Sequence, residues 1–285
     1  MAEPTAPSVK LYLDQTMAEA EMQPIAGGLA AVYSSRCPGK ESPNEDGAAL
    51  IPLGESSGLL VVADGVGGAR AGQEAASMAI RELQHAVERA LEEDLPARTA
   101  ILNGFENASK AIQELGFGAG STLAVVEVQD DTVRTYHAGD SMVLVVGSRG
   151  KVKLQTVSHS PVGFAVESGL LDEVEAMHHE DRHLISNALG MAEMRIEIGP
   201  SWKLAARDTV LLASDGLFDN LHTEEIVAEL RRGPLARVAE ALASHALERM
   251  VKAVEGQPSK PDDLTFLAFR RSGVNGGGAK TEPKG

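Results

Sequence analysis

Apolar residues recur at helical spacing in four parts of the chain. Between 71 and 91 they fall on one stripe of a helix, at Ala75, Met78, Ala79, Leu83, Ala86, Val87, Ala90 and Leu91. A second stripe begins after Pro96, a residue favoured at helix starts, and ends near Gly116. The patterns at 223–230 and 235–251 are also helical. The sequence therefore predicts two helices before a long middle segment and two after it.

Short apolar runs in the middle segment predict strands. The four that lie closest together are 122–128, 133–137, 142–146 and 152–157. Polar turns separate these four runs, which is typical of an antiparallel meander. Further runs at 194–198 and 209–213 are strand-like, whereas 165–185 lacks clean periodicity and is interpreted as an irregular flap. Strands joined by hairpins predict an α+β fold rather than alternating βαβ units.

The two ends of the chain lack such patterns. Residues 1–26 are interpreted as an N-terminal extension, with a short strand expected at 9–13. Residues 273–285 include three consecutive glycines and are expected to form a flexible C-terminal tail. Because no linker divides the middle, 27–272 is interpreted as one domain, and a chain of 285 residues with 43% hydrophobic residues can supply its core.

Composition narrows the class of protein. The formal net charge of −15 argues against binding to nucleic acid or to an anionic membrane surface. The single cysteine, Cys37, excludes an intramolecular disulfide and suits a reducing compartment. No signal-peptide pattern opens the chain, and no apolar run reaches the ~18 residues that a membrane helix needs. These features predict a cytoplasmic protein.

Acidic residues gather where apolar strands begin or end. The four clusters are Asn44-Glu45-Asp46-Gly47, Asp64-Gly65, Asp215-Gly216 and Asp262-Asp263. A carboxylate that precedes glycine at a strand end can turn inward while the backbone turns away. Carboxylates that meet in this way repel one another unless a cation joins them, and oxygen ligands select hard ions such as Mg²⁺, Mn²⁺ or Ca²⁺. The sequence thus predicts a carboxylate-bound metal centre.

The order of these clusters resembles the metal-dependent serine/threonine protein phosphatases of type 2C, in their bacterial form. The motifs that carry the resemblance are Asn44-Glu45-Asp46, Asp64-Gly65-Val66-Gly67-Gly68, Gly120-Ser121-Thr122, Gly139-Asp140-Ser141, Ala213-Ser214-Asp215-Gly216 and Asp262-Asp263. Each motif alone is weak, but six in the family's order over about 27–272 make a specific match. The resemblance implies a four-layer αββα sandwich, in which two antiparallel β-sheets pack face to face and helices flank both outer faces.

The resemblance also implies an activity, the hydrolysis of phosphoserine and phosphothreonine in proteins by a metal-activated water. Two Mn²⁺ or Mg²⁺ ions ~3.5–4 Å apart can activate the water and clamp the phosphate. The implied metal ligands are Glu45, Asp46, Asp64, Gly65, Asp140, Asp215 and Asp262. Of these, Asp64 would bridge the two ions and, with Asp46, act in catalysis, while Asp140 matches a residue that helps to bind a third, weaker ion in bacterial relatives.

The phosphate-binding side departs from the family pattern. Glu41 stands where family members usually carry an arginine that pairs with the substrate phosphate, and Arg36 or Lys40 on the same loop could replace it. Val66, Met142 and Asp263 stand where histidine, arginine and asparagine are common in the family. The metal side keeps the pattern, and this distribution indicates altered specificity rather than an inactive site.

Other functions remain open from the sequence. The runner-up is a catalytically weak relative that serves as a phosphoprotein-binding or regulatory module. His179-Glu180-Asp181-Arg182-His183 has zinc-protease spacing but lies outside any helical pattern, so it is interpreted as a coincidence. His137 and His159 are interpreted as core or surface histidines. The expected partners are phosphorylated proteins, including a cognate serine/threonine kinase or its targets, with no nucleic acid and no membrane.

Overall fold

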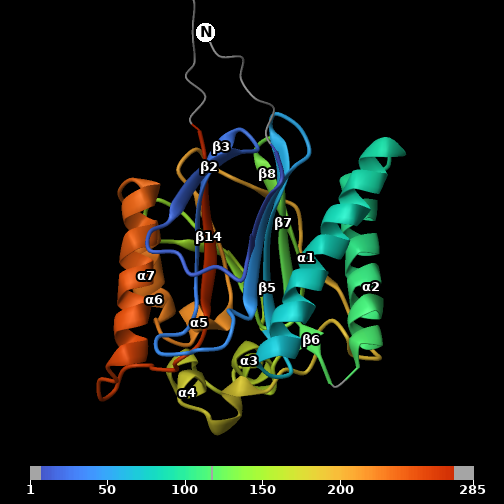
Figure 1. Ribbon diagram of the computed structural model, residues 1–285. Coiled ribbons are helices and arrows are strands. Elements are labelled where there is room, and N and C mark those ends of the chain that lie inside the picture. Colours follow the sequence, from blue (N-terminus) through green and yellow to red (C-terminus); the bar gives the residue numbers. More distant parts are fainter. Residues whose placement is uncertain (1–7, 117, 273–285) are drawn as a thin grey trace, which may run out of the picture.

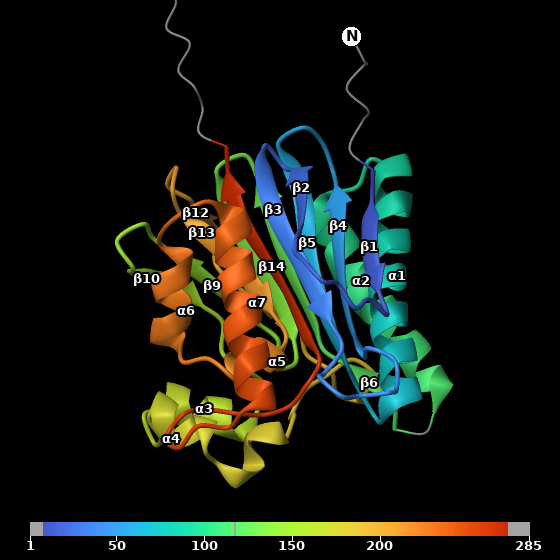
Figure 2. The ribbon, with the colours of Figure 1, turned by 60° about the vertical axis from the view of Figure 1, so that its left-hand side comes forward.

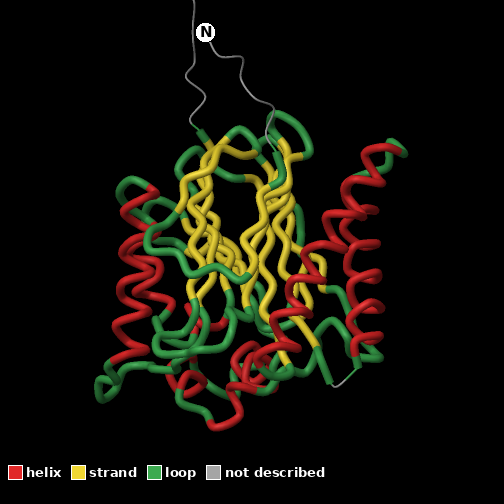
Figure 3. Tube along the Cα trace, viewed as in Figure 1, coloured by secondary structure: helices red, strands yellow, loops and turns green. Residues whose placement is uncertain are grey.

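The computed structural model describes residues 8–116 and 118–272, so the predicted tail at 273–285 lies outside it. Two antiparallel sheets pack face to face (Figure 1). Helices α1 (Ala69–Glu92) and α2 (Ala97–Leu115) cover one outer face, and α6 (Thr223–Leu230) and α7 (Leu235–Val251) cover the other (Figure 3). The predicted α+β sandwich and all four predicted helices are confirmed.

The sheet against α1 and α2 has eight strands. Its main path runs β1 (Lys10–Leu13), β4 (Asp46–Pro52), β5 (Ser57–Val66), β7 (Leu123–Gln129), β8 (Thr132–Ala138) and β11 (Glu197–Ile198). Two short strands lie off this path, β6 (Gly120–Ser121) beside β5 and β12 (Trp202–Lys203) beside β8. The strand predicted at 194–198 corresponds to β11, which has only two residues.

The sheet against α6 and α7 has six strands. Its order is β10 (Val152–Gln155), β9 (Met142–Val146), β13 (Thr209–Ala213), β14 (Leu264–Arg271), β3 (Gly28–Ser35) and β2 (Glu21–Ile25) (Figure 2). Strands β1 and β2 both fall within the predicted extension 1–26, and they pair with β4 and β3. Residues 10–25 thus supply an edge strand to each sheet. One of the two, β1, is the short strand expected at 9–13.

The predicted meander is wrong at its centre, because β8 and β9 lie in different sheets. The Gly139-Asp140-Ser141 turn carries the chain across, and Gly139 adopts φ 117°, where a Cβ would lie 2.5 Å from the Thr122 Cβ. Strand β10 also ends earlier than predicted, at Gln155. The carbonyl of Val157 bonds instead to the His137 ring at 2.9 Å.

The segment predicted as an irregular flap contains short helices. These are α3 (Pro161–Glu167), α4 (Glu173–Met177) and the 3₁₀ helix η1 (Glu180–His183). Local capping explains α4, because Asp172 and Glu175 form a reciprocal capping box. His179 precedes a 3₁₀ turn rather than lying on an α-helix, so the zinc-protease pattern lacks the helical face that it requires.

Three apolar layers form the core, one between the sheets and one under each helical pair. The run 59–62 shows why the chain has continuous apolar strands. Leu59 and Val61 face α1 and α2, whereas Leu60 and Val62 face the other sheet, and all four are fully buried. Strands covered on both faces need apolar residues at every position. Within the described residues, no helix is long and apolar enough to cross a membrane.

Candidate active site

The predicted acidic residues come together at one end of the sandwich. Asp46 opens β4 and lies directly opposite Asp64 near the end of β5, because the two strands are antiparallel. Asp215 follows β13 and begins the short helix α5 (Asp215–Phe218), and Asp262 precedes β14 in the other sheet. The Ser214 hydroxyl joins the two sheets here by donating to Asp46 Oδ2 at 2.8 Å.

Asp64 is held in place by the Gly120-Ser121-Thr122 motif. The Asp64 N–H donates to Thr122 Oγ1 at 2.9 Å, and the Asp64 carbonyl accepts from Thr122 N at 2.8 Å and Ser121 Oγ at 3.1 Å. Thr122 Oγ1 also lies 2.7 Å from Ser141 Oγ in the next motif. The serine and threonine motifs therefore have a local physical role, which is to fix the backbone that carries Asp64.

Two glycines allow the acidic segments to approach one another closely. A Cβ on Gly65 would lie 2.0 Å from the Gly72 carbonyl oxygen at the start of α1. A Cβ on Gly216 would lie 1.9 Å from the carbonyl oxygen of Asp263. Any side chain at either position would push α1 away from β5, or α5 away from the Asp262 segment, and would open the site.

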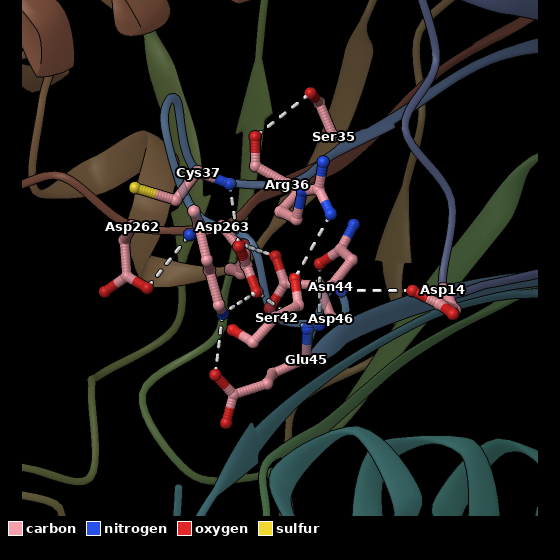
Figure 4. Close-up of polar contacts among 12 residues, drawn as sticks. Asp14, Ser35, Arg36, Cys37, Ser42, Asn44, Glu45, Asp46, Asp262 and Asp263 are labelled. Atoms are coloured by element: carbon pink, nitrogen blue, oxygen red, sulfur yellow. Dashed lines mark hydrogen bonds and ion pairs between the residues drawn. The ribbon is translucent and has the colours of Figure 1, made fainter. Parts of the chain in front are cut away.

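Asp263 organises the loop on the other side of the site (Figure 4). Its carboxylate accepts from the backbone N–H of Cys37 and of Glu45, each at 2.7 Å, and from Lys40 Nζ at 2.6 Å. Asp263 is only 3% exposed. Asp263, which stands where the family usually has asparagine, is thus paired with Lys40. This ion pair ties the loop to the start of β14.

Of the two predicted phosphate ligands, Arg36 contacts its own loop, whereas Lys40 also reaches Asp263, just before β14. Arg36 Nη1 donates to the carbonyl oxygens of Glu41 and Ser42 at 3.3 and 3.4 Å (Figure 4). Lys40 Nζ lies 2.6 Å from both Glu45 Oε2 and Asp263 Oδ2. Arg36 therefore makes long, weak contacts, whereas Lys40 makes short, charge-assisted ones.

The acidic cluster is electrostatically strained. Burial, followed by neighbouring carboxylates, raises the pKa values of Asp46 and Asp64 well above their ordinary range. Burial and then Asp215 raise the pKa of Asp140 to about 8, and Asp140 Oδ1 is buried with no hydrogen-bond partner among the described residues. A hard divalent cation fits this set of crowded carboxylate oxygens, because it would favour their charged forms.

Two residues of the cluster, Asp219 and Lys260, are absent from the predicted site. Lys260 Nζ contacts Asp215 Oδ2, and lies 2.9 Å from Asp219 Oδ2 and 3.1 Å from Asp262 Oδ2. Burial lowers the pKa of Lys260, but these carboxylates outweigh burial and raise it above its ordinary value. The spacing of Asp215 and Asp219, four residues apart, could have indicated a shared helix face. Nothing in the sequence near Lys260 marks it.

His137, His159 and Glu197 form a second polar cluster, and their ligand atoms lie within 4.8 Å of one another. The stacked rings have centroids 4.3 Å apart. His159 Nδ1 faces two N–H groups, Gly139 N at 3.1 Å and Asn187 Nδ2 at 2.8 Å, so its lone pair lies there. The proton is then on Nε2, which faces Glu197 at 3.1 Å. This tautomer supports the turn before Asp140 and leaves His159 without a free lone pair for a metal.

A cavity of about 330 Å³ opens beside the acidic cluster, between the flap and the core. Its polar end is lined by Asp140, Asp215 and Asp219. Its apolar part includes Val162 of α3 and Phe218 of α5. A substrate segment that approaches the carboxylates from this side would contact the flap.

Comparison with known proteins places this arrangement in one family. Residues 35–252 match the family described as Protein phosphatase 2C. The matched range includes Asp46, Asp64, Asp140 and Asp215 but not Asp262. A serine/threonine phosphatase stp of Listeria welshimeri is 29% identical over 246 residues, which cover 80% of this chain and 90% of the relative.

Solved structures give the same result. The serine/threonine phosphatase of S. agalactiae superposes with a TM-score of 0.71 at 26% identity, covering 85% of this chain and 98% of that one. The catalytic domain of the serine/threonine protein phosphatase PstP, in complex with two manganese ions, has a TM-score of 0.63 at 26% identity and covers 85% and 96%. The chain belongs to the protein phosphatase 2C family of metal-dependent serine/threonine phosphatases.

Proposed function

We propose that this protein hydrolyses phosphoserine and phosphothreonine in proteins at the acidic end of the sandwich. The convergence of Asp46 and Asp64 from one sheet with Asp215 and Asp262 from the other carries the proposal. In this proposal Asp64 would bridge two Mn²⁺ or Mg²⁺ ions. Asp215 and Asp262 would hold one ion, and Glu45, Asp46 and the Gly65 carbonyl would hold the other.

Bound divalent ions would supply an activated water and neutralise charge on the phosphoryl oxygens. The residues would prepare this site in two ways. Binding of a cation would favour the charged carboxylates of Asp46 and Asp64, which offsets the burial that raises their pKa values. The Ser214 hydroxyl would hold Asp46 Oδ2 and leave Oδ1 available to a cation. Val66 offers no proton, so the leaving group would take its proton from water.

Arg36 is the better candidate for the substrate phosphate. To reach it, Arg36 would give up contacts of 3.3 and 3.4 Å to two backbone carbonyls, which are near the limit of hydrogen bonding. Lys40 would have to leave the buried Asp263, and a buried carboxylate that loses its cation costs about 3–5 kcal/mol. The loop can therefore release Arg36 at much lower cost.

The proposal extends to the substrates, the cellular location and the number of metal ions. We infer that the substrates include a cognate serine/threonine kinase or its targets. The net charge of −15 and the single Cys37 support a cytoplasmic location and argue against nucleic acid or membrane surfaces as partners. A third ion at Asp140 has less support than the first two, because Lys260 already contributes a cation beside Asp215 and Asp219.

The decisive experiment compares wild type with Asp64→Asn on a phosphothreonine peptide, with Mn²⁺, with Mg²⁺ and with chelator. We expect turnover by wild type only with a divalent ion, and less than a few per cent of that turnover in Asp64→Asn. Asp130→Asn is the matched control, because it makes the same chemical change in the β7–β8 turn at the opposite end of the sheet. Peptide binding without turnover by wild type would favour the regulatory module, which the similarity to named phosphatases does not favour.

A further inference from the structure

The Lys260 ammonium is surrounded by carboxylates from two separate segments. Its Nζ contacts Asp215 at the start of α5, Asp219 at the end of α5, and Asp262 two residues further along its own segment. The side chain is only 20% exposed. The contact with Asp215 is a hydrogen bond, and those with Asp219 and Asp262 are ion pairs. One positive charge thus lies among three negative charges that would otherwise repel one another.

Hydrogen bonds hold the backbone around Lys260, so the fold itself places the Lys260 side chain beside the carboxylates. Lys260 N donates to Asn220 Oδ1 at 2.8 Å, and the Lys260 carbonyl accepts from Asn220 Nδ2 at 2.8 Å. The same Nδ2 donates to the Gly216 carbonyl at 2.9 Å, and Asn220 is fully buried. The neighbouring Ser259 carbonyl accepts from Arg182 of the flap at 3.2 Å. One buried amide therefore fixes Lys260 relative to α5.

We propose that Lys260 is a built-in counter-ion of the metal centre: it holds Asp215, Asp219 and Asp262 together before divalent ions bind, and it keeps a further divalent ion out of this corner. The inference rests on the proposed function, because Asp215 and Asp262 are proposed ligands. An ammonium carries one charge on a flexible stem, so it can neutralise the corner without meeting the coordination geometry of a divalent ion.

The proposal makes Lys260 compete with divalent ions for the same carboxylates. Replacing Lys260 by a neutral side chain of similar length should therefore have two opposite effects. The metal-free protein should become less stable, because three carboxylates lose the ammonium that they share. Divalent ions should bind more tightly or in greater number, because they alone can then neutralise the corner. A purely structural lysine would produce the first effect without the second.

The test is calorimetric titration of the full chain with Mn²⁺, together with thermal unfolding in chelator and in saturating Mn²⁺. For Lys260→Met we expect one additional Mn²⁺ per chain or at least a tenfold lower Kd. We also expect a Tm lowered by several degrees in chelator, and most of that loss recovered in Mn²⁺. Lys260→Arg keeps the charge and should retain the wild-type number of ions. If Lys260→Met does not fold, Lys260→Gln, which retains an amide donor, should show the same gain.

Lys153→Met is the matched control. Lys153, on β10, has its Nζ 2.7 Å from Asp208 Oδ2, and the exposed fractions are 24% for Lys153 and 3% for Asp208. Asp208 directly precedes β13, at the end away from Asp215. Its loss should lower Tm equally with and without Mn²⁺ and leave Mn²⁺ binding unchanged. Equal Mn²⁺ binding by wild type and Lys260→Met, with equal Tm losses in both buffers, would overturn the role of Lys260 alone. Absence of Mn²⁺ binding by wild type would instead contradict the proposed function.

Discussion

Two lysines contact carboxylates at the same end of the sandwich, yet the carboxylates differ in what else they bind. Asp263 beside Lys40 has donors on both oxygens, because the N–H groups of Cys37 and Glu45 also bond to it. Around Lys260, one oxygen each of Asp215, Asp219 and Asp262 shares a single ammonium. The Asp263 carboxylate is therefore saturated and structural, although Lys40 also contacts the proposed ligand Glu45, whereas the carboxylates around Lys260 are ones that a divalent cation can take over.

The largest effect is expected on the Lys260 side. Asp215→Asn removes a proposed ligand and should lower turnover at saturating Mn²⁺ by at least ~100-fold, since electrostatic stabilisation is commonly the largest catalytic contribution. Mn²⁺ should raise the Tm of wild type by mass action, and the mutant should lose most of that shift. Scanning calorimetry with and without Mn²⁺ measures it. An unchanged shift would place the ions elsewhere.

On the Lys40 side, the expected effect is on stability and is independent of metal. Asp263→Asn installs the family's usual residue but leaves Lys40 without its buried partner, which should lower the free energy of unfolding by about 3 kcal/mol. Urea unfolding in chelator and in Mn²⁺ should give the same loss. The double variant Asp263→Asn with Lys40→Met should recover part of it, because neither charge is then left alone. A loss seen only in Mn²⁺ would show that Asp263 acts on the metal centre.

The metal-free site should also make stability depend on pH. Asp140 has an ordinary pKa of 3.8, which burial and Asp215 raise to about 8 in the folded protein. The folded state therefore holds more protons than the unfolded state between these values, and the free energy of unfolding should fall as pH rises from about 4 to about 8. Urea midpoints in chelator at pH 5, 6.5 and 8 measure this slope.

Asp140→Asn should flatten that slope in chelator, because the amide does not titrate. Saturating Mn²⁺ should reverse it for wild type, because cation binding requires deprotonated carboxylates. A metal-free protein that gains stability between pH 5 and pH 8 would contradict the crowded, partly protonated cluster.

The smallest effect is expected for substrate binding. Arg36→Ala should raise KM for a phosphopeptide severalfold with a smaller loss in kcat, because a contact made equally in ground and transition states appears mainly in KM. Lys40→Ala tests the alternative and should chiefly lower stability through Asp263. A KM defect in Lys40→Ala alone would move the phosphate contact to Lys40. If neither variant changes KM, phosphate is held by the metal ions alone.

Prediction from the sequence was most accurate where structure is local. The helix patterns at 223–230 and 235–251 match α6 and α7 residue for residue, because one buried stripe specifies such a helix. The same information could not show that β8 and β9 separate into different sheets. A hairpin and a crossover between sheets both need a tight glycine turn, and only the packing of Gly139 against Thr122 distinguishes them here.

The sequence by itself determined the acidic residues at the strand ends, their order along the chain and the family that this order resembles. Only the tertiary structure decided which lysine side chains form ion pairs with those carboxylates. Lys40 and Asp263 are 223 residues apart, and Lys260 and Asp215 are 45 apart. Local propensity acts over a few residues, whereas partners at such separations meet only after the two sheets have packed. The acidic motifs are therefore readable in the sequence, but their lysine partners are visible only in the folded protein.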